Sequence, residues 1–211
     1  MGNFSVKRLF DLSLSGLGLA LSSPLWVLIA LAVKLEDGGP FFFTQERIGY
    51  RGRIFHARKF RSMVPDAEAR TGPVQARADD PRVTRTGKLL RATAMDELPQ
   101  LWNIFVGDMS FVGPRPLRPD EIETAGDGTV IPLSAIPGYE VRHSVRPGLT
   151  GLTQVYAPRD LPRVRKFRLD RLYVRRAGFW LDLKLVVLSF WISGRGRWEA
   201  GDRKVRRPGA V

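Results

Sequence analysis

The chain has 211 residues, no cysteine, two histidines and a net charge of +13 at pH 7. This length suits one domain with its own core, while the missing cysteines exclude disulfide scaffolds and thiolate metal sites, and two histidines are too few for zinc without carboxylate help. Residues 141–211 hold 17 Lys and Arg against 5 Asp and Glu, which suits nucleic acid, anionic lipid or phosphorylated substrates without distinguishing among them.

Residues 12–33 form an uncharged stretch, rich in Leu and Ala, that is long enough to cross a bilayer as a helix. Pro24 lies near its centre, lacks an amide hydrogen and clashes with the carbonyl of Ala20. The sequence therefore predicts a helix broken at Ser23-Pro24, where serine hydroxyls satisfy the freed backbone groups.

Basic residues flank this stretch on both sides, with Lys7 and Arg8 before it and Lys34 after it. The positive-inside tendency then favours a cytoplasmic position for both ends. We interpret residues 1–36 as a re-entrant membrane hairpin. Taken alone, the segment fits a kinked spanning helix equally well.

The middle of the chain begins with an extended pattern over residues 41–60, interrupted by a turn at Gly49–Gly52, which predicts a β-hairpin that ends near Lys59. Residues 65–82 are polar, contain Gly and Pro, and predict a loop or short helix. Residues 87–94 then form a basic helical approach to the next motif.

That motif, AMDELPQLW at residues 94–102, places Asp96 and Glu97 side by side in a basic chain. One interpretation is structural, with Asp96 capping a helix over 97–105 that buries an apolar stripe. The other is chemical, because a carboxylate is an established phosphoryl acceptor. The motif by itself leaves both interpretations open.

Two arginines are set in rigid turns after this motif. Pro114 and Pro116 flank Arg115, and Arg146 begins the second turn, RPGLTG. Arginine forks match phosphate oxygens, and Mg²⁺ takes one or two protein carboxylates besides water and substrate phosphate. The acids and arginines together indicate a phosphate site with a divalent cation, without a phosphate-binding glycine loop of the Walker or dinucleotide type.

The C-terminal third predicts two helices. Residues 163–176 interleave Arg and Lys with apolar residues, and residues 179–192 are strongly apolar with Trp180 and Trp191 near the ends. Such a pair suits the membrane interface. A core helix beside a solvated one is the alternative.

Five ordered blocks of this sequence resemble the bacterial sugar transferases, the monotopic polyprenyl-phosphate phosphoglycosyl transferases that start surface-glycan assembly. They cover nearly the whole chain: KRLFDLSLS…SSP (7–24), FFTQERIGYRGRIFHARKFRSM (42–63), DPRVTRTGKLLRATAMDELPQLWNIFVGDMSFVGPRP (80–116), RPGLTGLTQV (146–155) and KFRLDRLYV…WLDLKLV (166–186).

The resemblance implies an α+β fold, in which a small mixed catalytic domain over 37–211 follows the re-entrant helix and carries interfacial amphipathic helices. It implies transfer of a sugar 1-phosphate from a nucleotide diphosphate sugar, usually a UDP-sugar, to polyprenyl phosphate such as undecaprenyl phosphate. It also implies a monotopic enzyme on the cytoplasmic face of the bacterial inner membrane, in contact with membrane lipids, in the short form of the family without an additional N-terminal transmembrane bundle. The sugar, the pathway and the oligomeric state, including a homodimer, stay open.

The resemblance also implies roles for single residues. Asp96 matches the nucleophile that forms a covalent phosphosugar intermediate, Glu97 matches its catalytic partner, and the two would hold Mg²⁺. The other matching positions are Lys59, Arg91, Arg115 and Arg146, which contact or organise phosphates, and Asp170, a further acidic site. For Lys59, Arg115 and Asp170, an ion pair without a chemical role is the alternative.

Two other classes of protein fit parts of the sequence. A membrane-tethered nucleic-acid-binding protein would use the basic C-terminal third, and its affinity for duplex would fall steeply with salt. A structural membrane scaffold would need neither nucleotide nor magnesium. Neither class gives Asp96 and Glu97 a functional role. We therefore expect a phosphoglycosyl transferase that does not bind nucleic acid.

Overall fold

The computed structural model describes residues 2–67, 69, 80–119, 121–124, 129–158 and 161–198. Its α-helices are α1 (Gly2–Asp37), α2 (Arg85–Thr93), α3 (Gln100–Val106), α4 (Tyr139–His143), α5 (Leu152–Tyr156), α6 (Arg163–Arg176) and α7 (Phe179–Gly194). Its strands are β1 (Phe42–Ile48), β2 (Ile54–Phe60), β3 (Ser110–Val112), β4 (Ile122–Thr124), β5 (Val130–Pro132) and β6 (Gly148–Thr150). Three 3₁₀ turns complete the fold: η1 (Tyr50–Gly52), η2 (Met95–Glu97) and η3 (Leu133–Ala135).

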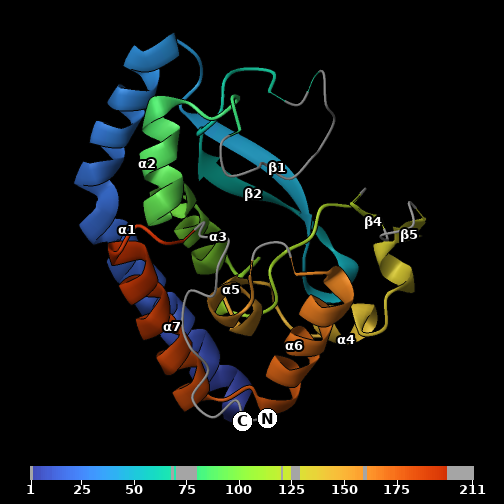
Figure 1. The fold of residues 1–211 in the computed structure, drawn as a ribbon. Helices are drawn as coiled ribbons and strands as arrows, with labels where there is room; N and C mark the ends of the chain where they lie inside the picture. Colours follow the sequence, from blue (N-terminus) through green and yellow to red (C-terminus); the bar gives the residue numbers. More distant parts are fainter. Residues whose placement is uncertain are drawn as a thin grey trace.

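Helices and short strands are mixed along the chain, which confirms the α+β prediction (Figure 1). The strands form three two-stranded sheets, in which β1 pairs with β2 and β4 with β5 in antiparallel fashion, while β3 and β6 are parallel. The largest core cluster joins α3, β3, α5 and α7, and the side chains of Ile104, Val112, Val155 and Leu185 are fully buried in it. The helices thus supply most of the core around very small sheets.

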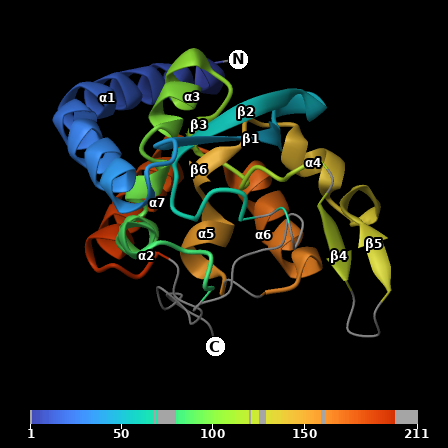
Figure 2. The same cartoon turned by 90° about the horizontal axis from the view of Figure 1, so that it is seen from above.

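Helix α1 bends near its middle without leaving the helical conformation (Figure 2). Pro24 lies inside the helix and leaves the carbonyl of Ala20 without its usual amide donor. The hydroxyl of Ser23 donates to that carbonyl over 2.9 Å, and the Ser22 hydroxyl accepts from the indole of Trp26. The predicted serine compensation is therefore confirmed, while the predicted break is a bend in a continuous helix.

The N-terminal half of α1 is fastened to the rest of the protein by charged side chains. Lys7 Nζ lies 2.5 Å from an Asp182 carboxylate oxygen, and Arg8 donates to the carbonyls of Ile104 and Phe105 at the end of α3. Asp11 is buried and accepts hydrogen bonds from the hydroxyl of Ser110 and from a β3 backbone amide. Lys7 and Arg8, which the sequence offered as flanking charges, thus have partners inside the fold.

The outer surface of α1 is apolar. Residues 6–37 are long and apolar enough to cross a membrane, and little of this stretch is buried against the protein. Helix α7 lies beside α1 in both views (Figures 1 and 2) and also exposes large apolar side chains, among them Trp180, Phe190 and Trp191. Two neighbouring helices therefore present apolar surface of the kind that a membrane covers.

Several predicted elements are found where the sequence placed them. The hairpin over 41–60 is β1 and β2, and the two C-terminal helices are α6 and α7. The helix expected over 97–105 begins later, at Gln100, and ends at Val106. The loop predicted over 65–82 lies largely outside the described residues.

Candidate active site

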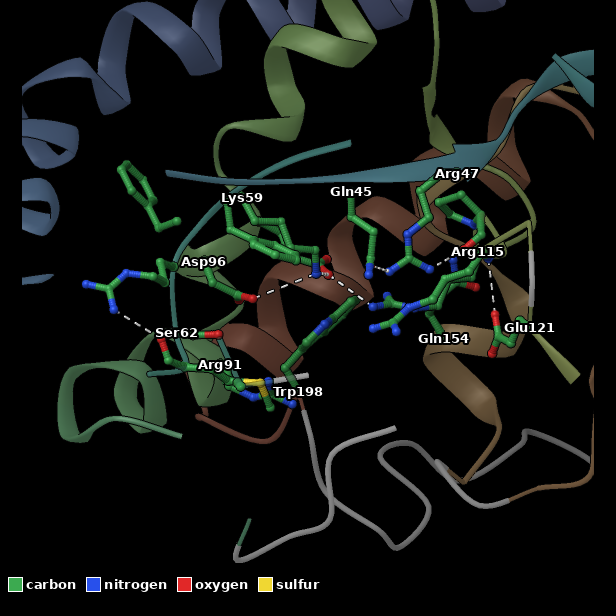
Figure 3. Close-up of a pocket in the computed structure, with 18 of the residues that line it drawn as sticks. Gln45, Arg47, Lys59, Ser62, Arg91, Asp96, Arg115, Glu121, Gln154 and Trp198 are labelled. Atoms are coloured by element: carbon green, nitrogen blue, oxygen red, sulfur yellow. Dashed lines mark hydrogen bonds and ion pairs between the residues drawn. The ribbon is translucent and has the colours of Figure 1, made fainter. Parts of the chain in front are cut away.

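A cavity of about 800 Å³ opens between the β1–β2 hairpin, η2 and the helices α5 and α6 (Figure 3). Its wall contains six of the seven residues to which the sequence assigned catalytic or phosphate roles: Lys59, Arg91, Asp96, Glu97, Arg115 and Asp170. These residues come from β2, α2, η2, the loop after β3, and α6. The fold thus brings together side chains that are up to 111 positions apart in the sequence.

The acidic pair is placed by a sharp turn after α2. Ala94 adopts a left-handed conformation, with φ of 59°, and its amide closes the end of α2 on the carbonyls of Leu90 and Arg91. The chain then makes the 3₁₀ turn that carries Asp96 and Glu97, whose residues are only 7 and 4% exposed. No side chain caps η2 or α3, so the interpretation of Asp96 as a helix cap is wrong.

Two cations surround the carboxylate of Glu97. Its Oε1 lies 2.5 Å from Lys59 Nζ and 3.1 Å from Arg115 Nη2. Burial by itself would raise the pKa of Glu97, but the charges of Lys59 and Arg115 outweigh it and lower the pKa to about 2. Glu97 is therefore ionised at any physiological pH.

Asp96 is more loosely held by the same lysine. Lys59 Nζ lies 3.8 Å from Asp96 Oδ2, well beyond its distance from Glu97. Lys59 thus touches both acids, but it binds Glu97 as a hydrogen-bonded partner and Asp96 only as a nearby charge. The two adjacent carboxylates have different surroundings, which suits different chemical roles.

Arg115 is presented by a turn that two further arginines hold. Arg142 Nη2 donates to the carbonyl of Arg115 over 2.6 Å, and Arg47 Nη1 donates to the carbonyl of Pro116 over 3.1 Å. These bonds add to the fixed φ angles of the two prolines. The rigid presentation predicted for Arg115 has structural support from residues that the sequence analysis did not single out.

Asp170 is a buried partner of Arg142. Arg142 Nε donates to Asp170 Oδ2 over 3.0 Å, and the hydroxyl of Thr153 donates to Oδ1 over 2.6 Å. Asp170 and Arg142 are each 3% exposed, and both contribute to the cavity wall. Because the Asp170 carboxylate already has these two partners, its surroundings favour a role in holding the Arg115 turn over direct chemistry.

The two remaining predicted arginines differ in position. Arg91 lies on α2 and contributes to the cavity wall. Arg146 is not among the wall residues in the described part of the chain, and its Nε donates to the carbonyl of Gly107 over 2.8 Å. The fold therefore places Arg91, but not Arg146, at the wall of the cavity that holds the acidic pair.

Other wall residues had no predicted role, among them Arg47, Arg142, Arg163 and Trp198. Arg47 alternates along β1 with Gln45 and Phe43. Trp198 follows α7, and its amide donates to the carbonyl of Ala92, which fixes this tryptophan at the cavity wall. Period-two alternation identifies Arg47 from sequence, but nothing local identifies the other three.

The acidic pair has the composition of a magnesium site. Within the described residues, no group of three or more His, Cys, Asp or Glu side chains is arranged to hold a metal ion. Asp96 and Glu97 supply two adjacent buried carboxylates, and Mg²⁺ commonly uses one or two such groups together with water and substrate phosphates. The donor set thus fits Mg²⁺ when a phosphorylated substrate completes it, and it does not fit a closed protein cage.

The sequence profile of the bacterial sugar transferases matches residues 2–195. The undecaprenyl-phosphate glucose phosphotransferase of Komagataeibacter xylinus is 42% identical over 190 residues, which cover 87% of this chain and 35% of that protein. The UDP-glucose:undecaprenyl-phosphate glucose-1-phosphate transferase of Klebsiella pneumoniae is 42% identical over 192 residues, or 89% of this chain and 40% of that protein. The chain therefore spans about two fifths of the length of these relatives.

A relative of similar size is the exopolysaccharide production protein ExoY of Rhizobium meliloti. It is 38% identical over 194 residues, which cover 85% of this chain and 81% of that protein. The region that the family profile matches includes the whole cavity wall except Trp198, which lies beyond it.

Proposed function

Because the chain belongs to the bacterial sugar transferase family, we propose that it transfers a sugar 1-phosphate from a nucleotide diphosphate sugar to polyprenyl phosphate. The observation that carries this proposal is the buried Asp96–Glu97 pair in a cavity whose wall also bears Lys59, Arg91 and Arg115. A UDP-sugar is the proposed donor and undecaprenyl phosphate the proposed acceptor, since the names of the relatives carry both. The product is a polyprenyl diphosphate sugar.

Asp96 is the proposed nucleophile. One of its carboxylate oxygens attacks the phosphorus that bears the sugar, the bond from that phosphorus to the bridging oxygen breaks, and the nucleoside monophosphate leaves with the bridging oxygen. An oxygen of polyprenyl phosphate then attacks the same phosphorus, and the bond to Asp96 breaks to restore the carboxylate. Glu97 is less suited to attack because two cations bind its carboxylate.

The cations of the site would stabilise charge on the diphosphate. Lys59 and Arg115 lie next to the acids, and the backbone of Arg115 is held by Arg142. Asp96 and Glu97 would hold Mg²⁺, which supplies charge neutralisation at the phosphates and reduces the repulsion between them and an anionic nucleophile. Preorganised positive charge in a buried site of this kind is the principal means by which proteins promote phosphoryl transfer.

The proposed location is the cytoplasmic face of the bacterial inner membrane. In this arrangement residues 1–36 enter the bilayer as a re-entrant hairpin that turns at Ser23-Pro24, and residues 37–211 form the catalytic domain at the surface. The bend of α1 and the apolar outer surfaces of α1 and α7 support this monotopic topology. A lipid acceptor then reaches the cavity without leaving the membrane.

The proposal is tested by intact-mass measurement of purified protein incubated with Mg²⁺ and a panel of UDP-sugars, beginning with UDP-glucose, without lipid acceptor. We expect a sugar-phosphate adduct on the wild type and none on Asp96→Asn, which keeps the side-chain volume but removes the nucleophile. The matched control is Glu140→Gln, which neutralises an exposed acid on α4 outside the cavity and should retain the adduct. An adduct that persists in Asp96→Asn would rule out this nucleophile, and no adduct on the wild type with any donor would rule out the covalent mechanism.

A further inference from the structure

The side chains of β1 that face the cavity change from apolar to cationic along the strand. Phe43, Gln45 and Arg47 alternate with their neighbours, so they lie on one face of the hairpin, and all three contribute to the cavity wall. Phe43 is the register partner of Lys59, which touches the acidic pair. Arg47 lies near Arg115 (Figure 3). Along this row the cavity wall therefore changes from apolar beside Lys59 and the acidic pair to cationic beside the Arg115 turn.

The apolar end is defined by Phe43 and the apolar wall residues near it, which are Pro40, Phe42, Met63 and Val64. Arg61, Ser62 and Asp66 line the same stretch of wall, and the guanidinium of Arg61 is paired with Asp37. Phe42 packs with ring centroids 6.0 Å from Trp26 of α1 and 5.4 Å from Phe60 of β2, while 42% of its own surface stays exposed. Trp26 lies two residues after Pro24, in the half of α1 whose outer surface exposes Val27, Leu28 and Leu31. Apolar surface thus continues from the outside of the bent membrane helix to the mouth of the cavity.

The cationic end is formed by Arg47, Arg115, Arg118 and Arg163. Figure 3 shows Arg47 and Arg115 on the side of the cavity that Glu121 borders, with Asp96 on the other side of Lys59. Phosphate and ribose oxygens are suited to this end, because arginine donors match them, and they are poorly suited to a wall of phenylalanine, methionine and valine.

We propose that the apolar end binds the isoprenoid chain of the lipid acceptor and the cationic end binds the nucleotide, so the two substrates of one site extend from Asp96 in opposite directions. The inference rests on the proposed function. In the first half-reaction the displaced nucleotide phosphate lies in line with the Asp96 oxygen, and in the second the attacking acceptor phosphate does. The acceptor phosphate therefore takes the position that the nucleotide phosphate has left. Only the groups attached to these phosphates differ, and each group has its own end of the cavity.

The test separates the two half-reactions in protein reconstituted into lipid nanodiscs. The first is the rate of adduct formation from a UDP-sugar without lipid acceptor, and the second is the rate at which the adduct is lost to undecaprenyl phosphate or to a short prenyl phosphate of two isoprene units. The variants are Phe43→Ala, Phe43→Leu and Arg47→Gln. Ile54→Ala is the matched control, since Ile54 is an exposed apolar strand residue that does not contribute to the cavity wall.

We expect Phe43→Ala to slow the loss of adduct to undecaprenyl phosphate by about tenfold, the size expected for removing one buried aromatic contact. Adduct formation and transfer to the short acceptor should be unchanged, Phe43→Leu should restore most of the rate, and Ile54→Ala should behave as wild type. Arg47→Gln should slow adduct formation more than it slows transfer, because Arg47 lies at the cationic end and also supports the Arg115 turn.

Two outcomes would overturn the inference while leaving the proposed function intact. One is an equal loss with long and short acceptors, which would mean that Phe43 does not contact the distal isoprenoid chain. The other is a defect of Phe43→Ala confined to adduct formation, which would place the donor at the apolar end. A wild type that forms no adduct would instead defeat the proposed function, and this inference with it.

Discussion

The ionised carboxylate of Glu97 contributes to the stability of the whole fold. Its pKa in the folded protein is about 2, below the ordinary value of 4.5, because Lys59 and Arg115 overcome the effect of burial. A carboxyl group with a lowered folded-state pKa stabilises the protein above its unfolded-state pKa, and this stabilisation is lost as the pH falls toward the folded-state value. The shift corresponds to about 3 kcal/mol at neutral pH.

We therefore predict that Glu97→Gln flattens the dependence of the melting temperature on pH between about pH 4.5 and about pH 2. Wild-type Tm should fall more steeply across this window, because only in the wild type does unfolding take up a proton at residue 97. The measurement is thermal unfolding in detergent, followed by tryptophan fluorescence. Glu46→Gln, which removes an exposed carboxylate on β1, should keep the wild-type slope, and an unchanged slope in Glu97→Gln would contradict the assignment.

The bend of helix α1 bears on how the protein sits in the membrane. Ser23 compensates the carbonyl that Pro24 leaves open, so the bend is stable in an apolar environment where an unsatisfied carbonyl is costly. Lys7, Arg8 and Asp11 hold the first half of the helix against β3, α3 and Asp182. The other end of α1 is also held, because Glu36 accepts hydrogen bonds from the amides that begin α2. Both ends of α1 are therefore attached to the rest of the protein.

A cysteine-labelling experiment tests this topology, and the chain suits it because it has no native cysteine. We expect Asn3→Cys and Leu35→Cys, placed near the two ends of α1, to react with a membrane-impermeant maleimide only from the cytoplasmic side of inverted vesicles. Pro24→Ala should straighten the helix and shift part of the Asn3→Cys signal to the opposite side. Labelling of the two single variants from opposite sides would show a true span.

Three surfaces lie side by side in the whole molecule. They are the apolar faces of α1 and α7 and the basic surface of α6. Phe10 of α1 packs edge-on against Phe179 at the start of α7, so the three surfaces meet where α6 ends. Arg175 and Arg176 at that end of α6 are exposed. A membrane surface with anionic headgroups accommodates both the apolar and the basic parts.

We predict that the double substitution Arg175→Gln and Arg176→Gln lowers affinity for anionic vesicles by roughly 10- to 30-fold at low salt, since each basic residue near such a surface contributes about 1 kcal/mol. Affinity for neutral vesicles should not change. The control double variant Arg51→Gln and Arg53→Gln neutralises two exposed arginines at the β1–β2 turn and should have a smaller effect. Co-sedimentation at two salt concentrations measures both, and strong, salt-sensitive binding of duplex DNA would instead support a nucleic-acid-binding protein.

The pattern of apolar and polar residues predicted much of the local structure. The period-two hairpin, the apolar helix with its central proline, and the two C-terminal helices are found close to their predicted positions. The start of α3 was misplaced, because the left-handed Ala94 and the 3₁₀ turn that follows it place Gln100, not Glu97, at the first helical position. A left-handed alanine is rare, and it is held here by its position between α2 and the acidic turn.

By itself, the sequence determined the family, the α+β class and the acidic pair, because these depend on residue types at short fixed spacings. The identity of the cations around that pair depends instead on the folded structure, because they come from separate elements. Arg91 and Arg115 contribute to the cavity wall while Arg146 donates to Gly107, and buried Arg142 supports Arg115 from a helix that carries no recognisable signal. Electrostatic interactions fall off with distance and depend on burial, so they are decided by side chains that meet in space, which spacing along the chain does not record.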